Sequence, residues 1–213
     1  MCGKPLLAYA AESALRSKLL SKVVLSTDDN EIAEIGKSLG LGVPFLRPAE
    51  LAEDTAPTFD VVIHAVSHLG SQGEFYDAVC LLQPTNPLRR AEDIDACIEL
   101  LETSGADSVI SVLPVPHDYN PKWVYWQNEN GGLVLSTGED SPVPRRQDLP
   151  PAFHRDGSVY VTRRTVLEYF GNLFGSKVRG YEIGQQYSVN IDTYEDWELA
   201  AKLLNSQVVE RRY

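Results

Sequence analysis

Cysteines and basic side chains are scarce in this sequence, and long apolar runs are missing from it. Its 213 residues include three cysteines, Cys2, Cys80 and Cys97, an odd number that stand mostly among apolar neighbours. Such a set predicts free thiols in a reducing cytosol rather than a disulfide scaffold. No segment has the apolar length of a membrane-spanning helix or the pattern of a signal peptide. We therefore expect a cytoplasmic protein.

Positive charge is in short supply. The chain carries 19 Lys and Arg against 30 Asp and Glu, a net charge of −11. This balance disfavours a surface that binds nucleic acid or an anionic membrane. An anionic ligand would need a local cluster of the few basic residues. We see no internal repeat or low-complexity tract, and the length predicts one domain over residues 1–213.

What the sequence does contain is an apolar run that stops abruptly in a polar loop. Residues 79–82 (VCLL) are typical of a strand buried on both faces of a parallel sheet, and the prolines at 84 and 87 end it. A helix is predicted from about Ala91. Open α/β sheets bind ligands where a strand ends in a loop that leads to a helix, and Gln83, Thr85 and Asn86 offer groups suited to a polyhydroxylated ligand. The alternative is a plain connection whose side chains satisfy nearby backbone.

Strands and amphipathic helices alternate along most of the chain. Further strands are predicted at 22–26, 43–46, 108–113 and 158–161, and helices are predicted near 5–15, 28–39, 57–66, 91–104 and 193–204. Alternation of this kind indicates right-handed crossovers. It predicts an α/β fold with a doubly wound, mostly parallel sheet of Rossmann-like type.

The alternation breaks between Pro114 and Pro151. This stretch contains Trp123, Tyr125 and Trp126, followed by an Asn-Gly-Gly turn. Aromatic strands around a glycine turn predict a hairpin that projects from the sheet. Aromatic side chains exposed outside the main core are commonly buried by a partner chain, so we expect residues 114–151 to form a homodimer contact.

One candidate metal site is rejected. His64 and His68 lie four residues apart on a predicted helix, a spacing that could present two imidazoles to one ion. Ala65 stands where a zinc-protease helix has its glutamate, and no third ligand is evident.

Five segments, in order, resemble the acylneuraminate cytidylyltransferases, which activate sialic acids as CMP-sugars. They are RPAELAEDTAPT at 47–58, LLQPTNPLR at 81–89, RRQDLP at 145–150, DGSVYV at 156–161 and NIDTYEDW at 190–197. The resemblance covers almost the whole chain. It implies a transfer in which the anomeric hydroxyl of a nine-carbon 2-keto sugar acid attacks the α-phosphate of CTP, pyrophosphate leaves and Mg²⁺ assists.

The resemblance implies that Asn190 and Asp192 are the catalytic metal ligands, alternating on a strand. The family normally has Asp at the first position, so this site loses one negative charge and should hold Mg²⁺ less tightly. The residues alone favour another interpretation, in which Asp192 is a carboxylate beside the N-terminus of a helix.

The remaining site residues are also implied by the resemblance. Those matched to the nucleotide are Arg47, Ala56 and Thr58, and those matched to the sugar acid are Gln83, Thr85, Asn86, Lys122, Arg146 and Tyr160. Family members more often carry Ser where this chain has Asn86. Arg suits a carboxylate through its planar guanidinium. Otherwise Arg47 is a solvated charge, Thr58 a first-turn helix residue and Tyr160 a core aromatic with its hydroxyl at the rim.

Family members begin with a buried strand and a loop rich in Gly, Arg and Lys that cradles the triphosphate, whereas this sequence starts just after that point. Gly3 and Lys4 cannot replace the cradle, which needs several converging backbone N–H groups. Two hypotheses stay open. The chain is a CMP-sugar-acid synthetase represented by a truncated sequence, or it is a non-catalytic relative that binds a nucleotide or sugar acid or acts as a dimer partner.

Overall fold

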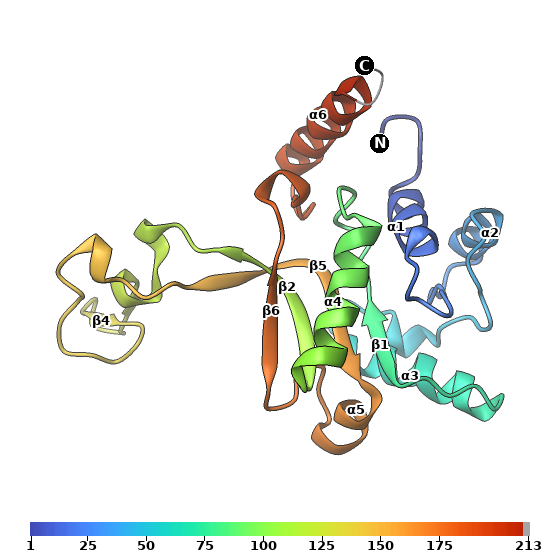
Figure 1. Cartoon of the computed structure of the whole chain (residues 1–213), viewed down its shortest axis with the longest axis horizontal. Coiled ribbons are helices and arrows are strands. Elements are labelled where there is room, and N and C mark those ends of the chain that lie inside the picture. The colour runs from blue at the N-terminus through green and yellow to red at the C-terminus, as the bar shows by residue number, and fades with distance from the viewer. Residues whose placement is uncertain (211–213) are drawn as a thin grey trace.

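The computed structural model describes the backbone of residues 1–210 and the side chains of residues 1–206. It contains a four-stranded sheet, helices packed around it and a long arm that projects from one side (Figure 1). The helices are α1 (Leu6–Arg16), α2 (Asn30–Ser38), α3 (Thr58–Ser71), α4 (Ala91–Ser104), α5 (Arg164–Phe170) and α6 (Tyr194–Glu210). The strands are β1 (Ala78–Leu81), β2 (Ser108–Pro114), β3 (Tyr125–Gln127), β4 (Leu133–Leu135), β5 (Phe153–Arg163) and β6 (Val178–Glu182). In the described part of the chain, no helix is long and apolar enough to cross a membrane.

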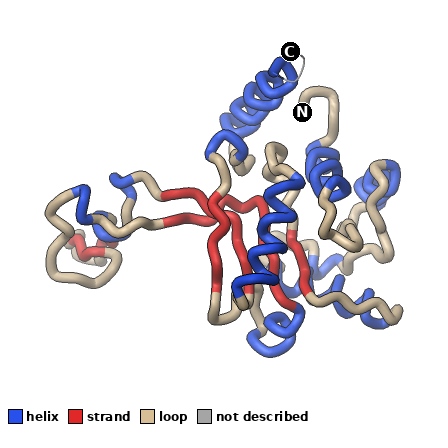
Figure 2. The backbone as a smooth tube through the Cα atoms, viewed as in Figure 1, coloured by secondary structure: helices blue, strands red, loops and turns tan. Residues whose placement is uncertain are grey.

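The main sheet has the strand order β1-β5-β2-β6. β5 runs antiparallel to both of its neighbours, and β2 and β6 are parallel. Three of the four strands therefore share one direction, and the predicted α/β, Rossmann-like class is confirmed. β5 is the exception to the parallel arrangement because the chain leaves β2 through the arm and returns from that same arm into β5. Figure 2 shows the arm leaving the sheet at the ends of these long strands.

Two predicted strands are wrong. Residues 22–26 and 43–46 are not strands, and only one parallel bridge, between Val24 and Gly42, joins this part of the chain. The residues of β1, predicted to be buried on both faces, are each only partly buried. Both differences have one physical cause, since β1 pairs with β5 alone and an open groove lies beside it. β6 and α5 were not predicted.

The core lies between α4 and the sheet. Ile94, Cys97 and Leu101 of α4 are almost completely buried against Val109 and Val161 of the strands. Burying each large aliphatic side chain stabilises the fold by about 1.5–3 kcal/mol. α4 ends where predicted, because Gly105 adopts φ 63°, a left-handed conformation that costs glycine little.

The predicted hairpin is present in the arm, where β3 and β4 pair in antiparallel register. Trp126 and Leu133 are 67% and 66% exposed. Trp123 is partly covered by the arm itself, and its indole Nε1 donates a hydrogen bond to the Val143 carbonyl at 2.7 Å. Few side chains of the described chain cover the arm, which leaves a large apolar surface exposed to water.

Candidate active site

The loop that follows β1 is held from below by a buried arginine. Arg89 is 6% exposed, and its Nε donates to the Ser158 carbonyl at 2.8 Å, while Nη2 donates to the Gln83 carbonyl. Burial lowers the Arg89 pKa to about 10, and the negative potential of Cys80 and Asp156 opposes that shift. The guanidinium therefore fixes the start of the loop to β5 while remaining charged near neutral pH.

The same loop is joined to the segment that precedes α6. Thr85 Oγ1 donates to Asn190 Oδ1 at 2.7 Å, and the Ile191 backbone N–H donates to the Thr85 carbonyl at 2.9 Å. Gly157 lies beside this junction with φ +84°, and a Cβ there would stand 3.5 Å from Asn190 Oδ1. The structure thus brings together the predicted sugar-binding loop and the predicted metal position, although they are about a hundred residues apart in sequence.

Asn190 and Asp192 are neighbours, but they do not lie on a strand as expected. They occupy an irregular stretch between the short 3-10 helix Gln185–Tyr187 and α6. Asn190 Nδ2 donates to Asp192 Oδ2 at 2.6 Å. A loop forms here because Asp196 accepts the backbone N–H groups of Asp192 and Thr193, at 3.1 and 2.8 Å, and these are then unavailable to a sheet.

The residues that cap α6 determine whether the Asp192 carboxylate is available to a ligand. Thr193 Oγ1 accepts from the Asp196 backbone N–H, and Asp196 Oδ2 accepts from the Thr193 backbone N–H, the reciprocal pair of a capping box. The exposed Asp192 carboxylate takes no part in that cap. Its only partner among the described side chains is the Asn190 amide, so the carboxylate remains accessible at the surface.

These residues fit a magnesium ion only in part. No group of three His, Cys, Asp or Glu suited to a metal exists in the described portion of the chain. Magnesium in phosphoryl-transfer sites is commonly held by one or two carboxylates plus substrate phosphates and waters. Asp192 supplies one carboxylate, and Asn190 can add a neutral amide oxygen. In the assigned orientation that oxygen accepts from Thr85 and the NH₂ faces Asp192, and the opposite amide orientation would exchange these roles.

Asn86 is completely buried rather than exposed in the loop. Its Nδ2 lies 3.4 Å from Asp156 Oδ2, and its Oδ1 accepts from the Leu88 backbone N–H at 3.2 Å. Asp156 is itself 5% exposed and also accepts from Ser158 Oγ at 2.5 Å. The Asn86 side chain therefore supports the loop from within, and its expected contact with a sugar has no geometric support.

The residues matched to the nucleotide gather along one groove. Arg47, Ala56 and Thr58 all line a cleft of about 1420 Å³ beside β1, and so does Gln83, which is matched to the sugar acid. Arg47 Nη2 lies 3.3 Å from Asp28 Oδ1, whereas its Nε is buried without a hydrogen-bond partner in the described structure. An unpaired buried guanidinium nitrogen is costly, so this nitrogen is a donor whose partner is absent from the described structure.

The residues matched to the sugar acid are only partly brought together. Tyr160 is half-buried on β5 opposite Leu81, and burial raises its pKa. Lys122 and Arg146 lie in the arm, which extends away from this end of the sheet (Figure 1). Lys122 is paired with Glu139, and Arg146 is exposed. Within one chain these two cations do not join Thr85 and Tyr160.

Sequence reasoning missed the buried polar network beneath the loop. Its centre is formed by Arg89 and Asp156, and Ser158 links it to Ser111 Oγ, 3.1 Å away on β2. Both charged residues stand in quoted motifs, LLQPTNPLR and DGSVYV, yet a charge next to a turn is usually solvated. Only the tertiary fold places the two side chains under one loop.

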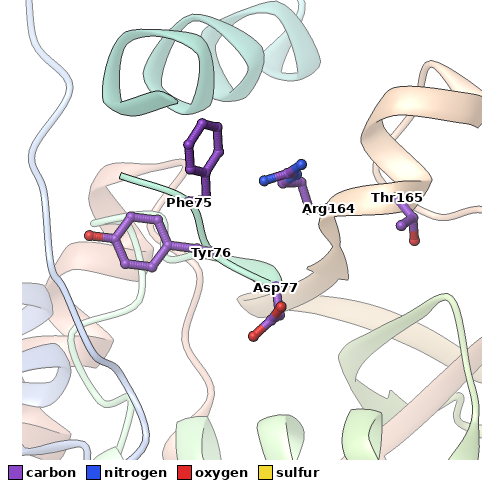
Figure 3. Close-up of a pocket in the computed structure, with 5 residues that line it drawn as sticks. All are labelled: Phe75, Tyr76, Asp77, Arg164 and Thr165. Carbon is purple, nitrogen blue, oxygen red and sulfur yellow. The ribbon is translucent and has the colours of Figure 1, made fainter. Parts of the chain in front are cut away.

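A second pocket lies near the amino end of β1, at the opposite end of the strand from the loop that follows it. It measures about 240 Å³ and is lined by Phe75, Tyr76, Asp77, Arg164 and Thr165 (Figure 3). Arg164 is already engaged, because it lies 5.3 Å from the Phe75 ring centre and 2.8 Å from Glu168. None of the predicted site residues lines this small, open pocket.

Comparison with known proteins identifies the family of this chain. The family described as "Cytidylyltransferase" matches residues 1–211. The chain belongs to this family. It is 31% identical over 207 residues to the CMP-N,N'-diacetyllegionaminic acid synthase of Legionella pneumophila, covering 96% of this chain and 87% of that protein. It is 32% identical over 199 residues to the pseudaminic acid cytidylyltransferase of Campylobacter jejuni, covering 93% of this chain and 84% of that one.

A solved structure extends the likeness to the fold. The CMP:2-keto-3-deoxy-manno-octonic acid synthetase complexed with CTP matches with a TM-score of 0.69 and 16% identity. The match covers 96% of this chain and 89% of that one. At this identity the likeness concerns the fold alone, and it agrees with a cytidylyltransferase-type α/β architecture.

Proposed function

We propose that this family member transfers CMP from CTP to a nine-carbon 2-keto sugar acid of the sialic-acid type. The family match over residues 1–211 carries the proposal. It is supported by the junction of Thr85 with Asn190 and Asp192 at the end of β1, where an α/β sheet binds its ligand. Relatives named for legionaminic and pseudaminic acids are consistent with the nine-carbon class.

The reaction forms one bond and breaks one. The anomeric oxygen of the sugar acid bonds to the α-phosphorus of CTP, the bond from that phosphorus to the bridging oxygen breaks, and pyrophosphate leaves while the hydroxyl proton passes to solvent. Such transfers ask a protein mainly to orient the reactants and neutralise charge. Gln83 and Thr85 would orient the sugar acid, and Arg47 would contact the nucleotide from the groove.

Asp192 and Asn190 would hold Mg²⁺ when it is present. The ion would neutralise phosphate charge, which is the chemistry it commonly supplies in this reaction class. Asn190 would take part through its amide oxygen, so its amide would have to turn away from the orientation in which it donates to Asp192.

We also propose a cytoplasmic homodimer. The support is the exposed apolar surface of the arm together with the positions of Lys122 and Arg146 on it. A two-fold assembly in which each arm reaches the other copy would cover Trp126 and carry the two cations toward the partner's loop. The three free thiols of the described chain suit a reducing compartment.

One observation favours a second candidate. Because the Asn190 amide occupies the Asp192 carboxylate through a hydrogen bond and contributes no second negative charge, the same fold could bind a nucleotide or sugar acid without catalysis. The two functions separate in a coupled assay of pyrophosphate release from CTP, run with neuraminate, legionaminate, pseudaminate and an eight-carbon octulosonate as acceptors. Acceptor-dependent release supports transfer. Calorimetric binding of CTP without release in any mixture supports the non-catalytic alternative.

A further inference from the structure

A charged contact outside the loop and the groove joins the two parts of the candidate site. Arg90 directly follows Arg89 and is the N-cap residue of α4. Its Nε donates to Asp93 Oδ2 at 2.8 Å, and its Nη2 donates to Asp93 Oδ1 at 2.6 Å. A bidentate pair of this kind fixes the plane of the guanidinium as well as its position.

Asp93 is a rigid support for that guanidinium. It is 2% exposed, and its Oδ1 also accepts from the Tyr181 hydroxyl of β6 at 3.2 Å. Because burying an unpaired carboxylate is costly, these donors keep the Asp93 side chain in one place. The hydrogen bonds to Asp93 also raise the pKa of Arg90, so the guanidinium stays charged. Arg90 is thus fixed to both α4 and β6.

The face of the same guanidinium lies against an aromatic ring. Arg90 Cζ is 4.0 Å from the centre of the Tyr187 ring, within the range of about 6 Å over which the face of an aromatic side chain attracts a cation. Tyr187 is the last residue of the 3-10 helix Gln185–Tyr187. The contact therefore ties this short helix to the first turn of α4.

The chain that follows Tyr187 carries both predicted metal ligands. Asn190 and Asp192 stand three and five residues beyond it. Between them, the Ile191 backbone N–H donates to the Thr85 carbonyl at 2.9 Å. The segment is therefore joined at two points to one unit, which consists of the loop after β1 and the start of α4.

The other contacts of this segment are less directional. Val189 is buried beside Leu88 in a small apolar cluster, and Ser188 Oγ donates to Asp156 Oδ2 at 3.3 Å, which is long for a hydroxyl donor. Apolar burial has no preferred direction, so it holds the segment against the core without fixing its position along the core. The stacked guanidinium supplies the directional constraint.

We infer that Arg90 is a positioning residue, which acts through the Tyr187 ring to hold Asn190 and Asp192 beside Thr85. Its importance for turnover rests on the proposed transfer of CMP, whereas the placement of the segment is a property of the chain alone. Magnesium requires near-ideal octahedral geometry, and misplacing a reacting group by about 1 Å can cost about 10²-fold in rate. An arginine that acts only through a neighbouring ring therefore affects kcat.

A matched control exists near the amino end of β1. Arg164 lies 5.3 Å from the centre of the Phe75 ring and donates to Glu168 Oε1 at 2.8 Å, so it also combines a carboxylate with an aromatic face. Arg164 and Phe75 line the small pocket of Figure 3, which none of the predicted site residues lines. Phe75→Leu therefore removes the same kind of contact without touching the site.

Three further variants of the full chain test the stack itself. Tyr187→Leu removes the ring, Arg90→Lys keeps a charge but loses the planar guanidinium, and Tyr187→Phe keeps a stacked ring. Amide hydrogen exchange at Ile191 is followed by NMR, with Leu101, buried in the middle of α4, as the reference for global stability. Pyrophosphate release gives kcat and the KM for CTP.

Tyr187→Leu and Arg90→Lys should speed exchange at Ile191 about tenfold or more and leave Leu101 unchanged. In both variants kcat should fall about 10- to 100-fold while the KM for CTP stays close to that of the parent, because the alignment of the metal ligands is lost and nucleotide binding is not. Tyr187→Phe and Phe75→Leu should match the parent in every measurement.

Parental exchange at Ile191 in Tyr187→Leu would overturn the inference. Equal acceleration at Ile191 and Leu101 would also overturn it, since only global stability would then have changed. Faster exchange with an unchanged kcat would overturn the role of Arg90 in the reaction. A parent that releases no pyrophosphate would contradict the proposed transfer alone, and faster exchange confined to Ile191 would then still support the placement of the segment by Arg90.

Discussion

Thr85 Oγ1 donates a 2.7 Å hydrogen bond to Asn190 Oδ1, joining the loop after β1 to the segment before α6. The bond fixes the side-chain oxygen of a predicted metal ligand and the hydroxyl of a predicted sugar-binding residue at one point. It therefore couples the two halves of the candidate site.

Removing the Thr85 hydroxyl should weaken the contact between the loop after β1 and the segment before α6. We expect Thr85→Ala to lower the free energy of unfolding by about 0.5–1.5 kcal/mol, the usual net contribution of one hydrogen bond, and to raise KM for the sugar acid. Thr85→Ser keeps the donor and should behave like the parent. Thermal melts and initial rates at varied acid concentration are the measurements, and an alanine variant unchanged in both would disprove the coupling.

Restoring a carboxylate at position 190 should tighten magnesium binding. With Asn190→Asp, the Asp192 carboxylate loses its amide donor and gains a like charge, so the variant should melt lower than the parent in EDTA and recover as Mg²⁺ is added. The parent should show a weaker response to the ion. Melting curves across a magnesium titration test this without requiring turnover.

Asp192→Ala should abolish metal-dependent activity, whereas Asp196→Ala, which removes the α6 cap, should cost about 0.5–2 kcal/mol of stability and leave magnesium dependence intact. If Asp192 served only the helix dipole, its loss would cost about 0.3–1 kcal/mol and spare the chemistry. An active Asp192→Ala variant with ordinary magnesium dependence would refute its role as a ligand.

The arm should be the surface through which two copies associate. Trp126 is 67% exposed there, while Tyr169 of α5 is 83% exposed elsewhere and provides a matched control. By light scattering at micromolar concentration we expect a dimer for the parent and for Tyr169→Asp, and a monomer for Trp126→Asp, because a charge at the centre of an apolar interface is costly. A monomeric parent would contradict the proposal.

Asp95 should make stability depend on pH in the acid range. It accepts from Ser17 Oγ at 2.5 Å and from the backbone N–H groups of Lys18 and Leu19 at 3.1 and 3.2 Å. Burial alone would raise its pKa, but these donors outweigh that effect and leave the pKa below the ordinary value of 3.8. A depressed folded-state pKa stabilises the fold above the unfolded-state pKa, and this stabilisation is lost as pH falls through the folded value.

Accordingly, Asp95→Asn should be less stable than the parent by about 1–2 kcal/mol at pH 7, and the difference should shrink below about pH 4. Glu99→Gln, on the exposed face of α4, is the control and should be neutral. Urea titrations at several pH values make the comparison. A difference that persists unchanged to pH 2 would show that the donors do not act through the carboxylate charge.

The sequence predicted the elements whose signals are local. The apolar face of α4 and its end at Gly105, the hairpin around Gly131 and the loop after β1 could each be read from neighbouring residues. The 22–26 segment could not, because a strand exists only when partners complete its ladder, and in the described structure this segment makes a single bridge, between Val24 and Gly42. The antiparallel direction of β5 depends on the path of the arm, which leaves no trace in periodicity.

The sequence predicted only part of the site, because some of its residues are placed by the tertiary fold and leave no local signal. Thr85, Asn190 and Asp192 were found through motif resemblance, and the fold does bring them together. Asn86 was expected to contact the sugar acid, yet its amide is buried against Asp156. Arg89 was overlooked, because only the tertiary arrangement shows one guanidinium bonded to carbonyls of both the loop and β5.

The central claim is nucleotidyl transfer, and double labelling of CTP tests it most directly. CTP labelled at the α- or γ-phosphate is incubated with the protein, Mg²⁺ and a nine-carbon sugar acid. The account predicts that the α-label appears in the CMP-sugar acid and the γ-label in pyrophosphate. If the α-label appeared in no sugar product with any acid tested, the claim would be contradicted.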